Sequence, residues 1–256
     1  MRTFYHTLRF WIIMVLLSLM LSLAALAARL FDPSGNTSHR IASLWARCLC
    51  QWNGIQVEVR GLEHVQRHRA QVFVANHQGF FDIFALAGYL PVQLRWMAKA
   101  SLFRIPLVGW SMYAADYIPV LRTDRKSAYR AFLQGIEKLK GGASIVIFPE
   151  GTRSEDGRIG RFKKGGTLLA LRAGAPLVPV TLAGTGRILR KGSMRVHPGR
   201  VQMIISPPIE AEVLKETGEG EVLESIRDLI CRNYETALLS ERGRPEAAVP
   251  PAAAGS

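Results

Sequence analysis

Cysteine is scarce in this chain, and the few thiols lack the spacing of a metal site. Only three cysteines occur among 256 residues, Cys48, Cys50 and Cys231. The C-x-C pair has no second Cys/His pair at zinc-ligand spacing, and an odd count gives no disulfide framework. We therefore expect three small apolar side chains packed in the protein. This usage favours a reducing, cytoplasmic location for the globular part.

Motifs of several common enzyme classes are also missing. The sequence contains no G-x-S-x-G elbow, no G-x-x-x-x-G-K-[ST] loop and no G-x-G-x-x-G. His64 and His68 have helical i,i+4 spacing but lack the glutamate of H-E-x-x-H, so they predict a polar loop. The sequence therefore shows no nucleophile elbow, no nucleotide-phosphate loop and no metal-ligand set.

Acidic residues are few in the first four fifths of the chain. Residues 1–209 carry 28 Lys/Arg against 10 Asp/Glu, whereas residues 210–256 carry 5 against 10. A strongly basic body suits an anionic partner such as nucleic acid, anionic lipid or a phosphorylated substrate. No basic-aromatic signature accompanies the charge, so nucleic acid is not expected as a partner.

Charge is absent from a long apolar run near the start. Residues 10–28 are uncharged and lie between Arg9 and Arg29. As a helix they measure roughly 28 Å at about 1.5 Å per residue, close to the hydrocarbon thickness of a bilayer. A membrane helix is the favoured interpretation, and a cleavable signal peptide with small residues at 24–28 is the alternative. Positive charge flanks both ends, so the positive-inside rule does not give the orientation.

Residues 39–52 have the pattern of an amphipathic helix. Basic residues, Arg40 and Arg47, accompany the tryptophans Trp45 and Trp52. This combination suits a helix that lies at a bilayer surface. A helix that simply packs on the globular domain explains the same pattern.

From residue 55 onward, the pattern alternates between strand and helix. Strand patterns cover residues 55–60, 71–75, 94–98, 117–120, 144–148, 176–182 and 201–206. Helical patterns cover residues 82–89, 127–140, 167–173 and 221–239. Such alternation predicts an α/β domain around a largely buried sheet. We divide the chain into a membrane-anchoring segment (1–53), a catalytic domain (54–241) and a disordered Pro/Ala-rich tail (242–256).

The first candidate site follows the strand at 71–75. His77 stands near the strand end, and Asp82 stands five residues later at the start of a helical run. Residues five apart diverge by roughly 140° in a regular helix, so they meet only if Gly79 allows a turn and Asp82 lies near the helix start. The carboxylate then orients the imidazole as a general base. An ordinary strand–turn–helix junction, in which Asp82 only caps the helix, is the alternative.

The second candidate site follows the very apolar strand at 144–148, where open α/β sheets place ligands. It is the segment Phe148-Pro149-Glu150-Gly151-Thr152-Arg153-Ser154. Gly151 permits close backbone approach, and Arg153 offers a planar fork for phosphate. A solvated loop with a structural Glu150–Arg153 pair is the alternative. Further basic residues follow other strands and have either a phosphate role or only surface solvation: Lys99, Arg122, Lys163 and Lys164.

Four blocks of the sequence resemble a known family when they are taken in order. The blocks are Asn76-His77-x4-Asp82, residues 117–122, residues 148–154 and residues 178–180. They resemble those of the glycerophospholipid acyltransferases, and among these the lysophosphatidic acid acyltransferases most. The resemblance covers about residues 40–210 and includes Arg161-Phe162-Lys163-Lys164-Gly165.

The resemblance implies a mostly buried mixed sheet flanked by helices, as in glycerol-3-phosphate acyltransferases. It makes His77 the general base that deprotonates the acceptor hydroxyl and Asp82 the orienting carboxylate. The alkoxide then attacks an acyl thioester directly, so no acyl-enzyme and no cofactor are needed. This fits a sequence without a recognisable activated serine or cysteine.

The resemblance also implies an acceptor-binding set. The set consists of Asn76, Lys99, Arg122, Glu150, Gly151, Thr152 and Arg153. Arg122 and Arg153 suit the phosphate, and Lys99 is a candidate cation near the developing oxyanion. Leu121 stands where the second block usually has an acidic residue, which departs from the pattern. Pro179 belongs to the fourth block, for which a structural role is possible.

The implied reaction is acylation of the sn-2 hydroxyl of lysophosphatidic acid to give phosphatidic acid. Acyl-CoA or acyl-carrier protein is the implied donor, and an anionic bilayer surface is the further partner. We expect the catalytic domain on the cytoplasmic side of a membrane, such as a bacterial inner membrane. The alternatives are another acceptor, namely glycerol-3-phosphate or a lyso-aminolipid, and a non-catalytic peripheral lipid-binding protein.

Overall fold

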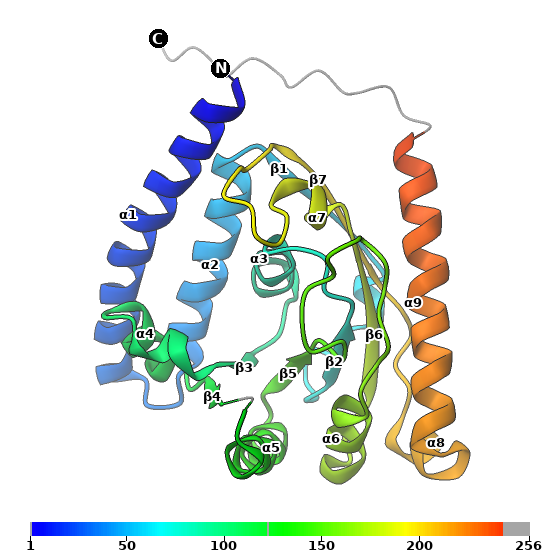
Figure 1. Ribbon diagram of the computed structural model, residues 1–256. Coiled ribbons are helices and arrows are strands. Elements are labelled where there is room, and N and C mark those ends of the chain that lie inside the picture. The colour runs from blue at the N-terminus through cyan, green and yellow to red at the C-terminus, as the bar shows by residue number, and fades with distance from the viewer. Residues whose placement is uncertain (1, 122, 243–256) are drawn as a thin grey trace.

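A seven-stranded sheet forms the centre of the protein (Figure 1). The computed structural model describes residues 2–121 and 123–242. The strands are β1 (Ile55–Arg60), β2 (Val72–Ala75), β3 (Leu94–Lys99), β4 (Ile118–Val120), β5 (Ser144–Ile147), β6 (Leu177–Ala183) and β7 (Gly199–Ile205). Their order is β1-β7-β6-β2-β5-β3-β4. Only the β6–β7 pair is antiparallel among the paired strands, so the sheet is mixed, as the resemblance implied.

The side chains of the central strand β2 point alternately into two hydrophobic cores, one on each face of the sheet. Phe73 and Ala75 face one side of the sheet, whereas Val72 and Val74 face the other, because successive side chains of a strand point to opposite faces. All four residues of β2 and all seven of β6 are buried. These strands are covered on both faces, so nearly all of their side chains are buried. This explains the uninterrupted apolar runs in the sequence.

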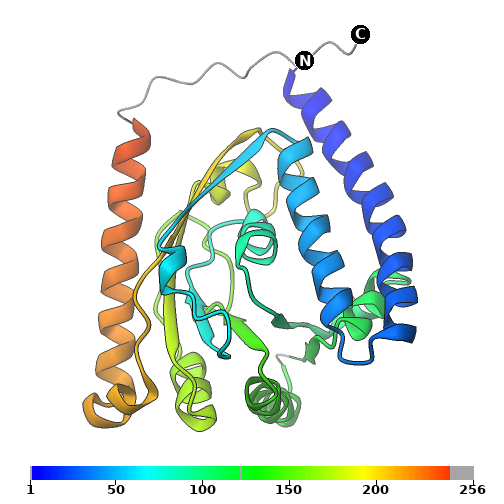
Figure 2. The ribbon, with the colours of Figure 1, turned by 180° about the vertical axis from the view of Figure 1, so that it is seen from behind.

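Helices cover both faces of the sheet (Figures 1 and 2). One face packs against α1 (Arg2–Phe31), α2 (Asn36–Trp52) and α3 (Phe81–Tyr89). The other packs against α5 (Arg125–Lys140), α6 (Gly165–Ala173), α8 (Ala211–Thr217) and α9 (Glu219–Arg242). Three shorter elements are η1 (Leu62–His64), η2 (Ala100–Arg104) and α4 (Val108–Ala114), and α7 (Thr185–Ile188) follows β6.

The N-terminal helix α1 is packed on the domain along one side only. It is the one helix of the described residues that is long and apolar enough to cross a membrane. Phe10 and Leu17 are buried in the core, whereas Phe4 and Leu16 on other sides of the helix are 73% and 62% exposed. The helix therefore presents a large apolar surface away from the domain.

The amphipathic helix α2 is an internal helix of the domain. It lies between α1 and α3 (Figures 1 and 2). Trp45 donates its indole N–H to Ser18 Oγ at 3.1 Å and meets the Phe84 ring edge to face at 5.0 Å. Ala46 and Leu49 are fully buried. Of the two interpretations of residues 39–52, the structure therefore favours the packed helix.

Every regular element expected from the sequence is present, and all but α1 lie within a few residues of their predicted ends; α1 begins at Arg2, eight residues before the apolar run 10–28. The sequence did not indicate the short elements η1, η2, α4, α7 and α8. The boundary after residue 53 stays a prediction, and α1 and α2 contribute to the same core as the sheet. Of the expected tail, residues 243–256 lie outside the described residues, and α9 continues to Arg242.

The cysteines have the packing role expected of them. All three are free thiols, and Cys50 is buried between helices. Burial raises the pKa of the Cys50 thiol to about 12. Since the thiolate is the nucleophilic form, Cys50 is chemically inert at neutral pH.

Removing a buried aromatic anchor of α1 tests how this helix is held. We expect Phe10→Ala to lower the free energy of unfolding by about 3–5 kcal/mol, because the ring is fully buried and contacts Phe81. Phe4→Ala is the matched control, since the same change on the exposed side should cost less than about 0.5 kcal/mol. Thermal unfolding in detergent micelles measures both. Equal effects of the two changes would show that α1 does not pack on the domain through Phe10.

Candidate active site

The carboxylate of Asp82 gathers three donors around one oxygen. His77 Nδ1 lies 2.7 Å from Asp82 Oδ2, and the backbone N–H groups of Gln78 and Gly79 donate to the same oxygen at 2.7 and 2.8 Å. Asp82 is fully buried, and 14% of the His77 side chain is exposed. The expected contact between histidine and aspartate is therefore confirmed. With Nδ1–H directed at the carboxylate, Nε2 is the ring nitrogen left to accept a proton.

The turn that brings these residues together depends on Gly79, for a reason other than the expected one. The φ angle of Gly79 lies outside the left-handed region. Instead, a Cβ at this position would come within 2.5 Å of the Thr185 carbonyl oxygen. Asp82 is the second residue of α3 and reaches back across the turn rather than capping the helix from outside. A glycine is needed here because the turn packs directly on the backbone that follows β6.

The aromatic ring of Phe148 stacks on one face of the His77 imidazole. The two rings stack with centroids 3.9 Å apart and planes 13° from parallel, and Trp96 continues the stack behind Phe148 at 6.4 Å. One edge of the imidazole is bound to Asp82 and one face is covered. Among the described residues, no side chain hydrogen-bonds to Nε2. The sequence did not indicate this stacking, although Phe148 lies within the second candidate site.

Glu150 binds two backbone groups of the protein itself. Its Oε1 accepts the His77 backbone N–H at 2.7 Å, and its Oε2 accepts the Gly160 N–H at 2.9 Å. Burial raises the pKa of the Glu150 carboxyl, and the two N–H donors oppose that shift. Both oxygens are therefore occupied in joining the loop 150–160 to the histidine turn. This geometry favours a positioning role over the substrate-binding role expected for Glu150. Among the ion pairs of the described residues, there is none between Glu150 and Arg153.

The turn after Glu150 brings two cationic side chains beside the site. Gly151 has φ +78°, a conformation that favours glycine, and its missing Cβ would lie 3.0 Å from Lys163 Nζ. Arg153 is partly exposed two residues further on, and Ser154 donates its N–H to the His77 carbonyl at 2.8 Å. Lys163, one of the basic residues that follow the strands, is thereby placed next to this turn.

The remaining expected site residues lie in three different settings. Asn76 is fully buried, and its amide exchanges two hydrogen bonds of 2.8 Å with the Leu182 backbone, so it joins β2 to β6 instead of facing a substrate. Thr152 is exposed and accepts a bond from Lys191 at 3.3 Å. Lys99 is exposed at the end of β3, and its role stays a prediction. Arg122 lies outside the described residues.

An apolar cavity of about 340 Å³ lies next to the aromatic stack, between α1, α2, α3 and α4. Trp96, Phe80 and Phe84 are among its lining residues. Trp96 links it to His77, because it stacks on the same Phe148 that covers the imidazole. The site therefore combines an oriented histidine and a cationic turn at the carboxyl ends of β2 and β5, and an apolar cavity lies beside them. This is the edge at which open α/β sheets bind ligands.

The fold and this site define a mixed α/β protein with a histidine oriented by a buried carboxylate at the carboxyl edge of its sheet. A protein-family profile described as Acyltransferase matches residues 56–183, which is half of the chain. The chain therefore belongs to the acyltransferase family.

Individual relatives agree with this assignment. The chain is 38% identical over 203 residues to 1-acyl-sn-glycerol-3-phosphate acyltransferase LPAT1, chloroplastic, from Arabidopsis thaliana, with 77% of this chain and 56% of the relative covered. It is 37% identical over 168 residues to 1-acyl-sn-glycerol-3-phosphate acyltransferase from Pseudomonas aeruginosa, with 65% and 62% covered. The chain thus spans little more than half the length of these curated relatives.

A solved structure has the same fold over nearly its whole length. The crystal structure of the 1-acyl-sn-glycerophosphate (LPA) acyltransferase, PlsC, from Thermotoga maritima superposes with a TM-score of 0.79 at 27% identity. The match covers 92% of this chain and 97% of that chain. The two chains therefore share most of their architecture.

Replacing Glu150 by glutamine tests whether it positions the histidine turn. An amide supplies one acceptor oxygen where the carboxylate has two, so one of the N–H groups of His77 and Gly160 loses its partner, at a cost of about 1–3 kcal/mol. We expect faster hydrogen exchange at these two amides and a lower melting temperature. The control is Glu155→Gln in the same loop, where the carboxylate is 80% exposed and should contribute little. Unchanged exchange at His77 and Gly160 would contradict the positioning role.

Proposed function

We propose that the chain is a 1-acylglycerol-3-phosphate O-acyltransferase. It moves a fatty acyl group from an acyl thioester to the sn-2 hydroxyl of lysophosphatidic acid and gives phosphatidic acid. The observation that carries the proposal is the 2.7 Å bond from His77 to the buried Asp82, which leaves Nε2 directed away from the carboxylate. The names of the relatives support the same choice of reaction.

The proposed reaction uses His77 as base and then as acid. Nε2 takes the proton of the acceptor hydroxyl while the oxygen forms a bond to the thioester carbonyl carbon. The tetrahedral intermediate then loses its carbon–sulfur bond, and the imidazolium returns the proton to the departing thiolate. Asp82 stabilises the imidazolium and keeps its orientation. The reaction is balanced without a cofactor and without an acyl-enzyme.

The cationic residues beside Gly151 support lysophosphatidic acid as the acceptor. The acceptor phosphate is joined to the reacting carbon through one further carbon and an oxygen, so it must lie close to His77. Arg153 and Lys163 flank the turn that hydrogen-bonds to the His77 backbone, which suits a phosphate at this distance. Arg122 and Lys99 are the further cations that we assign to the acceptor or to the developing oxyanion.

The apolar parts of the structure support a lipid substrate at a membrane. The cavity lined by Trp96, Phe80 and Phe84 offers space for an acyl chain. The exposed apolar side of α1 suits insertion into a bilayer, and the basic body suits an anionic surface. We place the catalytic domain on the cytoplasmic side, where acyl-CoA or acyl-carrier protein supplies the acyl group.

Acceptor choice tests the phosphate assignment. Purified protein in detergent should transfer acyl groups to lysophosphatidic acid in preference to glycerol-3-phosphate or a lyso-aminolipid, with acyl-CoA or acyl-carrier protein as donor. Arg153→Ala should raise KM for lysophosphatidic acid about tenfold or more, because one charge-assisted bond contributes about 1.5–3 kcal/mol. Transfer only to the lyso-aminolipid would refute the phosphate role. No transfer to any acceptor would favour a non-catalytic lipid-binding protein.

Loss of the imidazole should stop turnover without unfolding the protein. We expect His77→Ala to lower kcat by about two to four orders of magnitude, the range for a general base. His68→Ala is the matched control, since His68 is exposed in the loop before β2. Initial rates and melting temperatures are measured for both. A His77→Ala variant with undiminished kcat would overturn the general-base assignment.

A further inference from the structure

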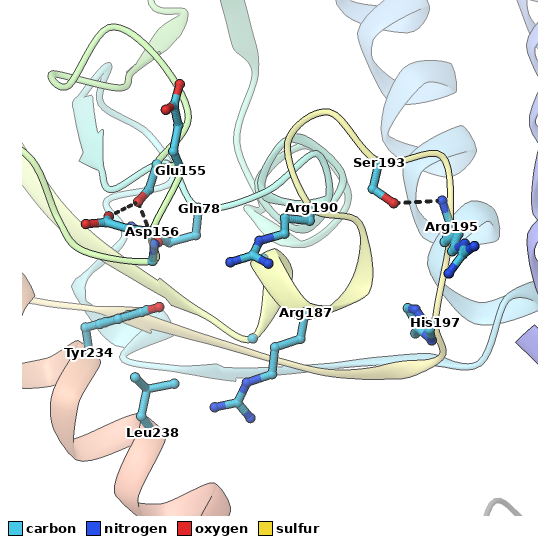
Figure 3. Close-up of a pocket in the computed structure, with 14 residues that line it drawn as sticks. Gln78, Glu155, Asp156, Arg187, Arg190, Ser193, Arg195, His197, Tyr234 and Leu238 are labelled. Carbon is cyan, nitrogen blue, oxygen red and sulfur yellow. Dashed lines mark hydrogen bonds between the residues drawn. The ribbon is translucent and has the colours of Figure 1, made fainter.

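A second and larger cavity, of about 580 Å³, opens directly beside the histidine turn. Figure 3 shows its walls: the loop with Glu155 and Asp156 on one side, Arg187 and Arg190 from α7 and the chain after it, and Tyr234 and Leu238 from α9. Arg195 and His197 lie at the other end of the view. The cavity therefore extends from the residue next to His77 across to the chain that leads into β7.

Gln78 contributes an unused amide to this cavity. The residue lines the cavity, is only 4% exposed and immediately follows His77. Neither its side-chain oxygen nor its side-chain nitrogen has a hydrogen-bond partner within the part of the chain that the structure describes. A buried amide without partners costs free energy, so such a group is commonly found where a ligand completes it.

The cavity carries an excess of available positive charge. The guanidinium groups of Arg190 and Arg195 make no hydrogen bond or ion pair with any described residue. The acids on the opposite wall already have cationic partners, because Glu155 binds Lys191 at 2.7 Å and Asp156 Oδ2 lies 3.8 Å from Arg158 Nε. Free arginines facing neutralised carboxylates favour an anionic ligand, and phosphate above all.

The walls of this cavity pack against the turn that carries His77 and are hydrogen-bonded to the N-terminal helix α1. A Cβ on Gly186 would lie 3.2 Å from the Gln78 carbonyl oxygen, so α7 packs on the turn without side chains between them. On the far side, Val196 N–H donates to Thr7 Oγ1 at 3.0 Å, and the Trp11 indole donates to the Met194 carbonyl at 3.0 Å. The arginine-bearing chain is thus fixed between α1 and the histidine.

We propose that this cavity binds the phosphopantetheine part of the thioester donor. The arm of such a donor carries amide groups that complement Gln78, and its phosphate lies a long flexible chain away from the thioester, where Arg190 and Arg195 are located. The inference rests on the proposed acyl transfer and assigns its donor to this side of His77. Acyl-CoA and acyl-carrier protein share the phosphopantetheine, so both are sources of the same ligand chemistry.

The acceptor phosphate does not explain this cavity equally well. It is separated from the reacting hydroxyl by only a few bonds, and Arg153 and Lys163 already lie at the turn beside His77. The cavity instead extends away from the histidine toward Arg195. An elongated ligand with amides near the reacting group and phosphate at a distance fits both ends of it.

Binding of CoA to a chemically silent protein tests the proposal apart from catalysis. In a His77→Ala background, which removes turnover, we measure CoA binding by calorimetry in detergent. Arg190→Ala with Arg195→Ala should weaken binding tenfold or more, as expected for charge-assisted bonds to phosphate. The matched control is Arg172→Ala with Lys215→Ala, which removes two exposed charges on α6 and α8, outside the cavity. Unchanged binding, equal weakening in both doubles, or no CoA binding at all would overturn the proposal.

Further probes distinguish the parts of the ligand and its sources. Phosphopantetheine should lose affinity in the double variant as CoA does, whereas pantetheine, which lacks phosphate, should bind both proteins equally. If the double variant binds both holo-acyl-carrier protein and CoA more weakly, the result supports binding of the phosphopantetheine group that the two share. Weakening toward the carrier protein alone would show a protein-docking surface instead, and equal losses for pantetheine would refute the phosphate contact.

Gln78→Leu separates a binding role from a structural one. The change keeps the side-chain volume and removes an amide without partners, so the melting temperature should stay the same or rise. Affinity for pantetheine should nevertheless fall severalfold, because the arm loses its hydrogen-bonding partner. Undiminished pantetheine affinity would remove Gln78 from the site. Since no readout here requires acyl transfer, a failed transfer assay and a failed donor site are distinguishable results.

Discussion

The buried carboxylate of Asp82 is the constraint on which the site depends. Its Oδ2 accepts two backbone N–H groups of the turn and the ring nitrogen of His77, all at 2.7–2.8 Å. Hydrogen bonds from these three donors offset the cost of burying the carboxylate. The same bonds fix the turn and the direction of Nε2. The hydrogen bonds that solvate one buried carboxylate thus also orient the histidine that we propose as the base.

Three further elements converge on that turn from different parts of the chain. Glu150 binds the His77 backbone, Phe148 covers the imidazole face, and Gly79 lets the turn pack on the chain after β6. The proposed acceptor side, with Arg153 and Lys163, follows β5. The cavity beside Gln78 follows β6. Under this proposal, the neighbouring parallel strands β5, β2 and β6 carry the acceptor site, the base and the donor site side by side at one edge of the sheet.

Sequence patterns predicted the elements well because burial imposes regular spacing on strands and helices. The spacing of His77 and Asp82 allowed their contact but also an ordinary junction, and only the resemblance of the four blocks favoured the contact that the structure shows. The roles of residues that bind backbone groups far away in the sequence could not be predicted from the sequence. Glu150 and Asn76 bind backbone atoms of remote segments, and the lack of partners for the Gln78 amide is visible only in the folded chain. Arg190 and Arg195 belong to no motif, and only the folded chain brings them to the cavity.

The central claim is that Asp82 holds neutral His77 with its proton on Nδ1 and leaves Nε2 as the base. Nitrogen-15 NMR of histidine-labelled protein in detergent micelles, with the His77→Ala variant to assign the signals, reads this tautomer directly. We predict that the neutral His77 ring carries its proton on Nδ1 and that Asp82→Ala abolishes this preference. A neutral ring protonated on Nε2 in the unaltered protein would contradict the account.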